Sequence, residues 1–169
     1  MDNWQEILES YSGGPDILSR AVAELPEEVL DQALNDNNWS IREIIHHIVE
    51  GDDLFVPFIK QALGGLGGEY KTGWYFEQSQ IEWGKRWGFD KREIGSALAL
   101  FKAKREHTCG ILSGVDTPWE FKLSITWPGN DPIEYSISEI MEIQIHHLNE
   151  HLGEIQAILQ FHQGIKQKD

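Results

Sequence analysis

Two histidines four residues apart near the end of the chain are the first candidates for chemistry. Residues 139–158 carry apolar side chains at helical spacing, and at about 100° per residue His147 and His151 fall within the apolar arc. Two imidazoles at i and i+4 can direct their nitrogens to one point, as when a metal ion takes two ligands from one helix. The neighbouring His146 falls on the opposite, polar face and is expected to be solvated. Alone, the pair also fits two ordinary hydrogen-bonded histidines at the edge of a core.

A third histidine lies in an earlier segment with the same kind of pattern. Ser40 followed by Glu43 is a capping-box signature, which predicts the start of a helix over residues 41–63. His47 lies at the edge of the apolar arc of this helix, whereas His46 falls with Arg42 on the side expected to face solvent. Each of the two helices therefore carries a His-His doublet whose second member faces inward.

A bundle that brings these inward faces together would assemble His47, His147 and His151. Three neutral imidazole nitrogens suit Zn²⁺ or Ni²⁺, and they leave at least one position open for water or substrate. The sequence therefore predicts a divalent metal site with these three ligands. The alternative is a structural cluster of histidines.

Four charged residues are candidates for supporting roles. Asp52 and Arg105 fall near the middle of apolar arcs on two predicted helices, where an isolated charge is costly. Either they form an interhelical ion pair, or they line a pocket in which Arg105 holds an anionic substrate group and Asp52 supports a ligand or transfers a proton. Glu150 and Glu154 lie at the polar border beside the last two histidines, where each could orient a ligand or simply be solvated.

The elements that must position these residues are mostly helical. Amphipathic patterning predicts a short helix at residues 2–11, ended by Gly13-Gly14, and bundle helices at 15–25, 41–63, 90–112 and 136–164. Pro57 falls on the solvent side of its helix, where a gentle kink is expected. We therefore expect an all-α four-helix bundle with a short extra N-terminal helix, in a single domain spanning residues 1–169.

Two connections are longer than simple turns. Residues 64–89 are rich in glycine and aromatic residues, which is typical either of a lid over a pocket or of a packed extension that seals the bundle. Between the third and fourth bundle helices, alternating apolar residues from Trp119 to Trp127 precede a Pro-Gly-Asn-Asp-Pro turn. This pattern predicts a small β-hairpin.

Composition and charge exclude some classes of partner. The formal charge of −14 over 169 residues repels phosphate backbones, which argues against nucleic-acid binding. The sequence contains no run of 18 apolar residues, so no membrane-spanning helix is expected. The single cysteine, Cys109, cannot form an internal disulfide, and we expect a buried thiol in a reducing cytoplasm.

The two histidine motifs resemble those of the DinB/YfiT-like family of metal-dependent proteins, the DinB superfamily. They read Trp-Ser-x-Arg-Glu-x-x-x-His at residues 39–47 and His-x-x-x-His-x-Gly-x-Ile at residues 147–155. The resemblance extends over about residues 15–160 and implies a four-helix bundle with a divalent metal held by His47, His147 and His151. The family's usual basic residue after the last histidine is Leu152 here, and the following Gln is Glu154, so the subfamily is left open.

This resemblance also implies a first expectation for function. Relatives use low-molecular-weight thiols such as bacillithiol or mycothiol, so we expect a metal-dependent S-transferase that acts on a small molecule with such a thiol as co-substrate. A metal-dependent hydrolase is the alternative among enzymes, because a metal ion can acidify water. A non-catalytic bundle stiffened by its metal is the alternative outside enzymes. A homodimer through the N-terminal helix and Trp4 is a further expectation.

Overall fold

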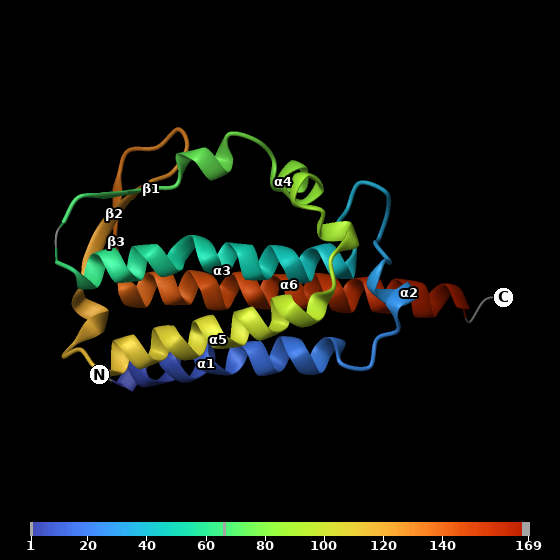
Figure 1. Cartoon of the computed structure of the whole chain (residues 1–169), viewed down its shortest axis with the longest axis horizontal. Coiled ribbons are helices and arrows are strands. Elements are labelled where there is room, and N and C mark those ends of the chain that lie inside the picture. Colours follow the sequence, from blue (N-terminus) through green and yellow to red (C-terminus); the bar gives the residue numbers. More distant parts are fainter. Residues whose placement is uncertain (1, 66, 167–169) are drawn as a thin grey trace.

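The computed structural model describes residues 2–65 and 67–166, and its frame is a bundle of four long helices (Figure 1). These are α1 (Asp2–Val22), α3 (Ile41–Leu63), α5 (Ile94–Ser113) and α6 (Ile137–Lys166). Helix α1 packs against α5 and α6, and α3 packs against the same two helices. The predicted four-helix bundle is confirmed. Among the described residues, no helix has both the length and the apolar character needed to cross a membrane.

The N-terminal part of the bundle differs from the prediction. Residues 2–11 and 15–22 do not form two helices, because α1 runs without interruption through Gly13, Gly14 and Pro15. Tyr11 and Leu18, on either side of the proline, are both buried in the bundle. Burial along one face of the helix therefore outweighs the local preference of glycine and proline to end it.

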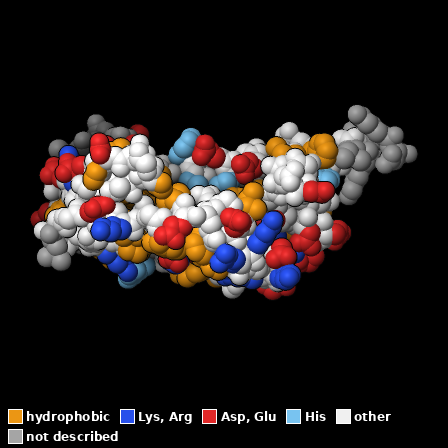
Figure 2. Space-filling model, turned by 90° about the horizontal axis from the view of Figure 1, so that it is seen from above, with side chains coloured by type: hydrophobic (Ala, Val, Ile, Leu, Met, Phe, Trp, Pro, Cys, Tyr) orange, Lys and Arg blue, Asp and Glu red, His pale blue; other side chains and the backbone are white. Residues whose placement is uncertain are grey.

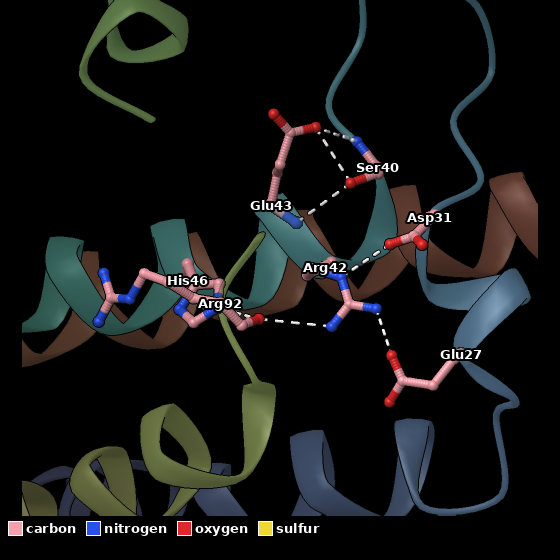
Figure 3. A network of polar contacts seen from close by, with 7 residues as sticks. All are labelled: Glu27, Asp31, Ser40, Arg42, Glu43, His46 and Arg92. Carbon is pink, nitrogen blue, oxygen red and sulfur yellow. Dashed lines mark hydrogen bonds and ion pairs between the residues drawn. The ribbon is translucent and has the colours of Figure 1, made fainter. Parts of the chain in front are cut away.

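The end of α3 that carries the histidines is held by a polar network (Figure 3). The Arg42 guanidinium pairs with Glu27 of α2 (Glu27–Leu30) and, through Nε, with Oδ1 of Asp31 at 2.7 Å, and it also donates to the carbonyl of Arg92 at 3.3 Å. The same carbonyl accepts a hydrogen bond of 3.1 Å from Nε2 of His46. The expectation that Arg42 and His46 face solvent was therefore wrong: they are 5% and 1% exposed.

His46 is buried by a segment that sequence periodicity could not place. Residues 67–91, here named the covering segment, contain β1 (Glu69–Lys71), η1 (Gly73–Phe76), α4 (Gln80–Trp87) and η2 (Phe89–Lys91). This segment lies along α3 (Figure 1), and Phe89 stacks on His46 with ring centroids 5.5 Å apart. The stacking of Phe89 on His46 is that of a packed extension, and Tyr75, Phe76 and Gln80 of the same segment also line a cavity beside His47, as a lid would. Because η2 occupies residues 89–91, α5 begins at Ile94 rather than at the predicted Asp90.

A small sheet closes one end of the bundle. Strands β2 (Lys122–Thr126) and β3 (Ile133–Ser136) form the predicted antiparallel hairpin, with Leu123 opposite Tyr135. Strand β1 of the covering segment adds to β2 in parallel, which the sequence pattern did not indicate. A short η3 (Pro118–Glu120) precedes the hairpin, and its Trp119 contacts Trp4 with ring centroids 5.3 Å apart. Trp4 is thus partly covered by Trp119 within the chain.

Helix α6 begins and ends close to its predicted limits. Ser136 and Glu139 form the expected reciprocal cap, in which the backbone N–H of Ser136 donates to Oε2 of Glu139 at 2.7 Å and the N–H of Glu139 donates to Oγ of Ser136 at 3.3 Å. The helix continues to Lys166 instead of fraying near Gly164. The rest of the predicted polar tail, residues 167–169, lies outside the described residues.

The bundle core is divided into two apolar clusters by a buried polar layer. One cluster contains Ile7 and Tyr11 of α1, and the other contains Leu18 and Val22 of the same helix. The residues between the clusters, one from each long helix, are Gly14, Asp52, Arg105 and Gln144. A Cβ atom on Gly14 would lie 2.4 Å from Nη1 of Arg105, so this glycine leaves the room that the guanidinium occupies.

Candidate metal site

Three histidine nitrogens converge between α3 and α6. Nε2 of His47 lies 3.0 Å from Nε2 of His147, which in turn lies 3.2 Å from Nε2 of His151. One ligand atom from each residue can be chosen so that all lie within 4.8 Å of one another. The structure therefore brings together the three residues that the sequence predicted as ligands. His146 points away, with its side chain 74% exposed and paired with Glu150 at 3.2 Å.

The environment keeps two of these imidazoles neutral. Burial, followed by the neighbouring His147 and His151, lowers the pKa of His47 to about 2. Burial and the nearby His151 and Arg105 lower the pKa of His147 to about 4. A neutral imidazole has a free lone pair, and this is the form that ligates a metal ion.

The spacing of the nitrogens agrees with ligation of one shared ion. Metal–nitrogen distances of about 2.0–2.1 Å place two neighbouring ligand nitrogens about 2.9 Å apart at octahedral angles and about 3.3 Å apart at tetrahedral angles. The two separations of 3.0 and 3.2 Å lie between these values. Among the described residues, the cluster that could hold a metal consists of these three histidines, which offer three nitrogen ligands.

Neighbouring side chains fix the orientation of the imidazole rings. Nδ1 of His151 donates to Oε2 of Glu154 at 2.8 Å, which leaves the lone pair of Nε2 directed at the cluster. The Trp39 ring lies 4.2 Å from the His47 ring and 6.1 Å from the His151 ring, centroid to centroid. Of the two glutamates predicted beside the site, Glu154 therefore contacts a ligand, whereas Glu150 contacts the solvated His146.

An apolar cavity of about 150 Å³ opens onto the cluster. Its lining comprises His47, Gly51, Leu54, Phe55, Tyr75, Phe76, Gln80, Trp127, Ile143, Gln144 and His147. These residues come from α3, the covering segment, α6 and the residue that follows β2. Neither Lys nor Arg lines this cavity. A Cβ atom on Gly51 would lie 2.7 Å from Cε1 of His147, so the His147 imidazole occupies the space that a side chain at position 51 would need.

A second hollow lies on the other side of the cluster. This cavity of about 450 Å³ is lined by Trp39 and Glu154, the two residues that contact the ligands, and by Gln80, which also lines the smaller cavity. Gln80 is the first residue of α4 and follows the Ser79 cap. The start of α4 thus lies between the two hollows.

Asp52 and Arg105 pair with each other in the polar layer. Nη2 of Arg105 lies 2.9 Å from Oδ1 of Asp52, and the two side chains are 1% and 2% exposed. The guanidinium also donates to the carbonyls of Tyr11 at 2.9 Å and Gln144 at 3.3 Å. Burial raises the pKa of Asp52, and the adjacent guanidinium opposes this shift. The geometry is that of the interhelical ion pair, and Arg105 does not line the cavity at the histidines.

Gln144, Trp39 and Gly51 are parts of the site that residue-type reasoning missed. Gln144 is 3% exposed, lines the smaller cavity, and donates through Nε2 to Oδ1 of Asp52 at 3.0 Å. It precedes His147 by three residues, a spacing that places both on one helix face. The three-residue spacing could have identified Gln144 from the sequence. The role of Gly51 depends on its contact with His147 of another helix, which the sequence of α3 alone does not indicate.

Comparisons with known proteins were made on both sequence and structure. The family model described as the DinB superfamily matches residues 11–155. YfiT from Bacillus subtilis, described as a probable metal-dependent hydrolase with an unusual four-helix bundle topology, superposes with a TM-score of 0.76 at 14% sequence identity. The match covers 92% of this chain and 85% of YfiT. A search of curated proteins gave no significant match. Because the family model spans most of the sequence, from the middle of α1 to Ile155, just after His151, this chain belongs to the DinB superfamily.

Proposed function

We propose that this protein is a divalent-metal-dependent hydrolase that acts on a small, largely apolar molecule. The observation that carries the proposal is the convergence of three imidazole nitrogens beside an apolar cavity, with His47 and His147 in its wall. The description of YfiT as a probable metal-dependent hydrolase supports the same class of reaction. Three neutral nitrogen ligands suit Zn²⁺ or Ni²⁺.

A divalent ion at this site would supply a Lewis acid and would lower the pKa of water toward neutrality. The residues of the chain supply the rest. Glu154 holds His151 in the tautomer that presents Nε2, and the Arg105–Asp52 pair fixes the Gln144 amide beside the cavity. The apolar walls contact the hydrocarbon part of a substrate and displace water from it.

The absence of cationic side chains from the cavity lining favours the hydrolase over the thiol-dependent transferase. Thiol cofactors that carry carboxylates need a positive group, and the expectation assigned this role to Arg105. Arg105 is 1% exposed and its donors are occupied by Asp52 and two carbonyls. The thiol-dependent S-transferase stays a prediction for which the cavity offers no anion partner, and we favour hydrolysis of a neutral ester or amide.

The test begins with the untagged protein stripped of metal and titrated with Zn²⁺ and Ni²⁺. We expect one ion per chain, and hydrolysis of neutral p-nitrophenyl esters of short acids only in the loaded form. His47→Ala, His147→Ala and His151→Ala should each lower metal affinity at least tenfold. His146→Ala is the matched control, because its side chain points to solvent.

Two results would contradict the proposal. Equal losses of metal affinity in His146→Ala and the inner variants would mean that the convergent nitrogens are not the ligands. A loaded protein that hydrolyses none of the esters or the corresponding anilides, and whose metal spectrum in the Co²⁺ form shows four protein ligands, would place the metal in a stabilising role.

A further inference from the structure

A separate cavity lies between α3 and the covering segment, and none of the three histidines lines it. Its volume is about 240 Å³. It is lined by Glu50, Asp53, Leu54 and Pro57 of α3 and by Tyr70, Trp74, Tyr75 and Trp87 of the covering segment. Half of this lining is aromatic, and its charged members are two carboxylates. Leu54 and Tyr75 also line the cavity at the histidines, so they form a wall between the two spaces.

The aromatic rings of this cavity face in different directions. The Trp74 and Tyr75 rings lie 5.6 Å apart with an interplanar angle of 77°. Trp87 stacks on Trp83, whose Nε1 donates to the carbonyl of Tyr75 at 2.8 Å and so ties α4 to η1. Trp74 remains 52% exposed although it is among the largest apolar side chains of the molecule. An exposed tryptophan at the mouth of an aromatic cavity is available to cover a ligand.

The charged groups that line the cavity are carboxylates. Its lining contains neither Lys nor Arg, and each carboxylate has one cationic partner beside it: Lys104, whose Nζ is buried, lies 2.5 Å from Asp53, and Arg92 lies 3.7 Å from Glu50. Despite these partners, Glu50 contributes to raising the pKa of Tyr75 to about 12, after burial, and Asp53 contributes to raising that of Tyr70. Acidic side chains are also spread over the face that carries α4 (Figure 2), in keeping with the formal charge of −14.

This combination selects one class of ligand. The face of an aromatic ring is negative and attracts cations, and carboxylates beside the rings attract them further. An anion would be repelled by Glu50 and Asp53, and a neutral apolar molecule would gain nothing from them while removing part of their hydration. A methylated ammonium group is attracted to both features, because its charge is spread over apolar methyl groups.

We infer that this cavity binds the alkylated ammonium group of a small organic cation, with Trp74, Tyr75 and Trp87 around the methyl groups and Glu50 and Asp53 as counter-charges. The site does not depend on the proposed hydrolase activity, since its lining contains no histidine. A cation bound here would lie beside Tyr75, on the far side of the wall from the metal site.

Calorimetric titration of the full chain with choline tests the inference. Its neutral isostere, 3,3-dimethylbutan-1-ol, has the same shape without the charge. We expect choline to bind at least tenfold more tightly than the alcohol, and added salt to weaken choline binding. Trp74→Ala and Glu50→Gln should each weaken choline binding severalfold. Trp74 is half exposed, so its removal leaves the core intact.

The controls separate this site from the histidine cluster. Glu77→Gln changes an exposed carboxylate of the covering segment outside the cavity lining and should leave choline binding unchanged. Choline should also bind to the metal-free protein and to His147→Ala, so a failure of the hydrolase proposal would not remove it. Equal affinity for the alcohol and choline would overturn the inference, as would choline affinity that Trp74→Ala and Glu50→Gln leave unchanged.

Discussion

Nη1 of Arg105 donates a hydrogen bond of 2.9 Å to the carbonyl oxygen of Tyr11. In a regular helix this carbonyl would accept the N–H of the fourth residue onward, which here is Pro15 and has no N–H. The guanidinium of α5 therefore replaces the hydrogen bond that proline removes from α1. This contact explains how α1 continues through Gly14 and Pro15 where the sequence predicted a break.

Arg105→Met should destabilise the protein strongly. The change leaves the Asp52 carboxylate buried without its counter-charge and the Tyr11 carbonyl without a donor. Breaking a buried pair of this kind costs about 3 to 5 kcal/mol. Chemical denaturation and thermal melting of the metal-free protein would measure the loss. Lys102→Met is a control on the same helix, because it breaks an exposed pair with Asp16 and should leave the melting temperature almost unchanged. A melting temperature of Arg105→Met equal to that of Lys102→Met would contradict the role given to this ion pair.

Glu154→Ala should weaken metal binding while leaving the fold intact. The variant removes the acceptor of the His151 Nδ1–H, so the ring loses its fixed tautomer and orientation. Loss of such an outer partner lowers metal affinity by about 10- to 100-fold. Glu154→Gln retains an oxygen acceptor and should lose less. Competition titration with a chromophoric chelator gives the affinities, and Glu150→Ala is the control because Glu150 pairs with His146 instead. Equal effects of the Glu150 and Glu154 variants would show that the His151 contact is unimportant.

Gly51→Ala should disturb the metal site from the opposite helix. The new methyl group would lie 2.7 Å from Cε1 of His147. Because α3 is closely packed in the bundle and cannot move away, the imidazole must shift. We expect metal affinity to fall by at least tenfold, measured as above. Gly153→Ala is matched to it, because Gly153 is an exposed helical glycine with nothing within 4 Å of its added Cβ. That control should gain about 0.5 to 1 kcal/mol of stability and retain its metal affinity. Unchanged metal binding in Gly51→Ala would mean that His147 is not held tightly by α3.

The sequence was sufficient to predict that the three candidate ligands lie together, because each belongs to a regular amphipathic helix. The helical phase of residues 41–63 and 139–158 places His47, His147 and His151 on the inward faces, independently of the conformation of the loops. In the structure these three side chains lie together. The capping boxes at Ser40 and Ser136 fix where these helices begin, so the phase carries little error. For the same reason, Asp52 and Arg105 could be recognised as buried charges in need of a partner.

The wrong predictions concern contacts between segments that are distant in the sequence, and helical periodicity does not predict such contacts. His46 and Arg42 lie on the polar face of α3, but Phe89 of η2 and the carbonyl of Arg92 cover that face, and both are distant from it along the chain. The continuity of α1 through Pro15 depends on a donor from another helix. The cavity at the histidines is likewise built from α3, α6 and the covering segment, whose glycine-rich sequence has no repeating pattern to place it.

The stability of the metal-free protein should fall as the pH decreases below about 6.5. In the folded state the pKa of His47 is lowered to about 2 and that of His147 to about 4, whereas in the unfolded chain both approach 6.5. Between these values the unfolded state binds more protons, so acid favours unfolding and stability increases with pH until about 6.5. Each histidine contributes about 1.4 kcal/mol per pH unit in this window. Urea denaturation at pH 7.5 and pH 5.5 measures the difference. His47→Phe should remove the contribution of one histidine and so lower the slope of the unfolding free energy against pH by about 1.4 kcal/mol per pH unit in this window. If the free energy of unfolding were the same at both pH values in the parent protein, the two imidazoles would not be held neutral by burial.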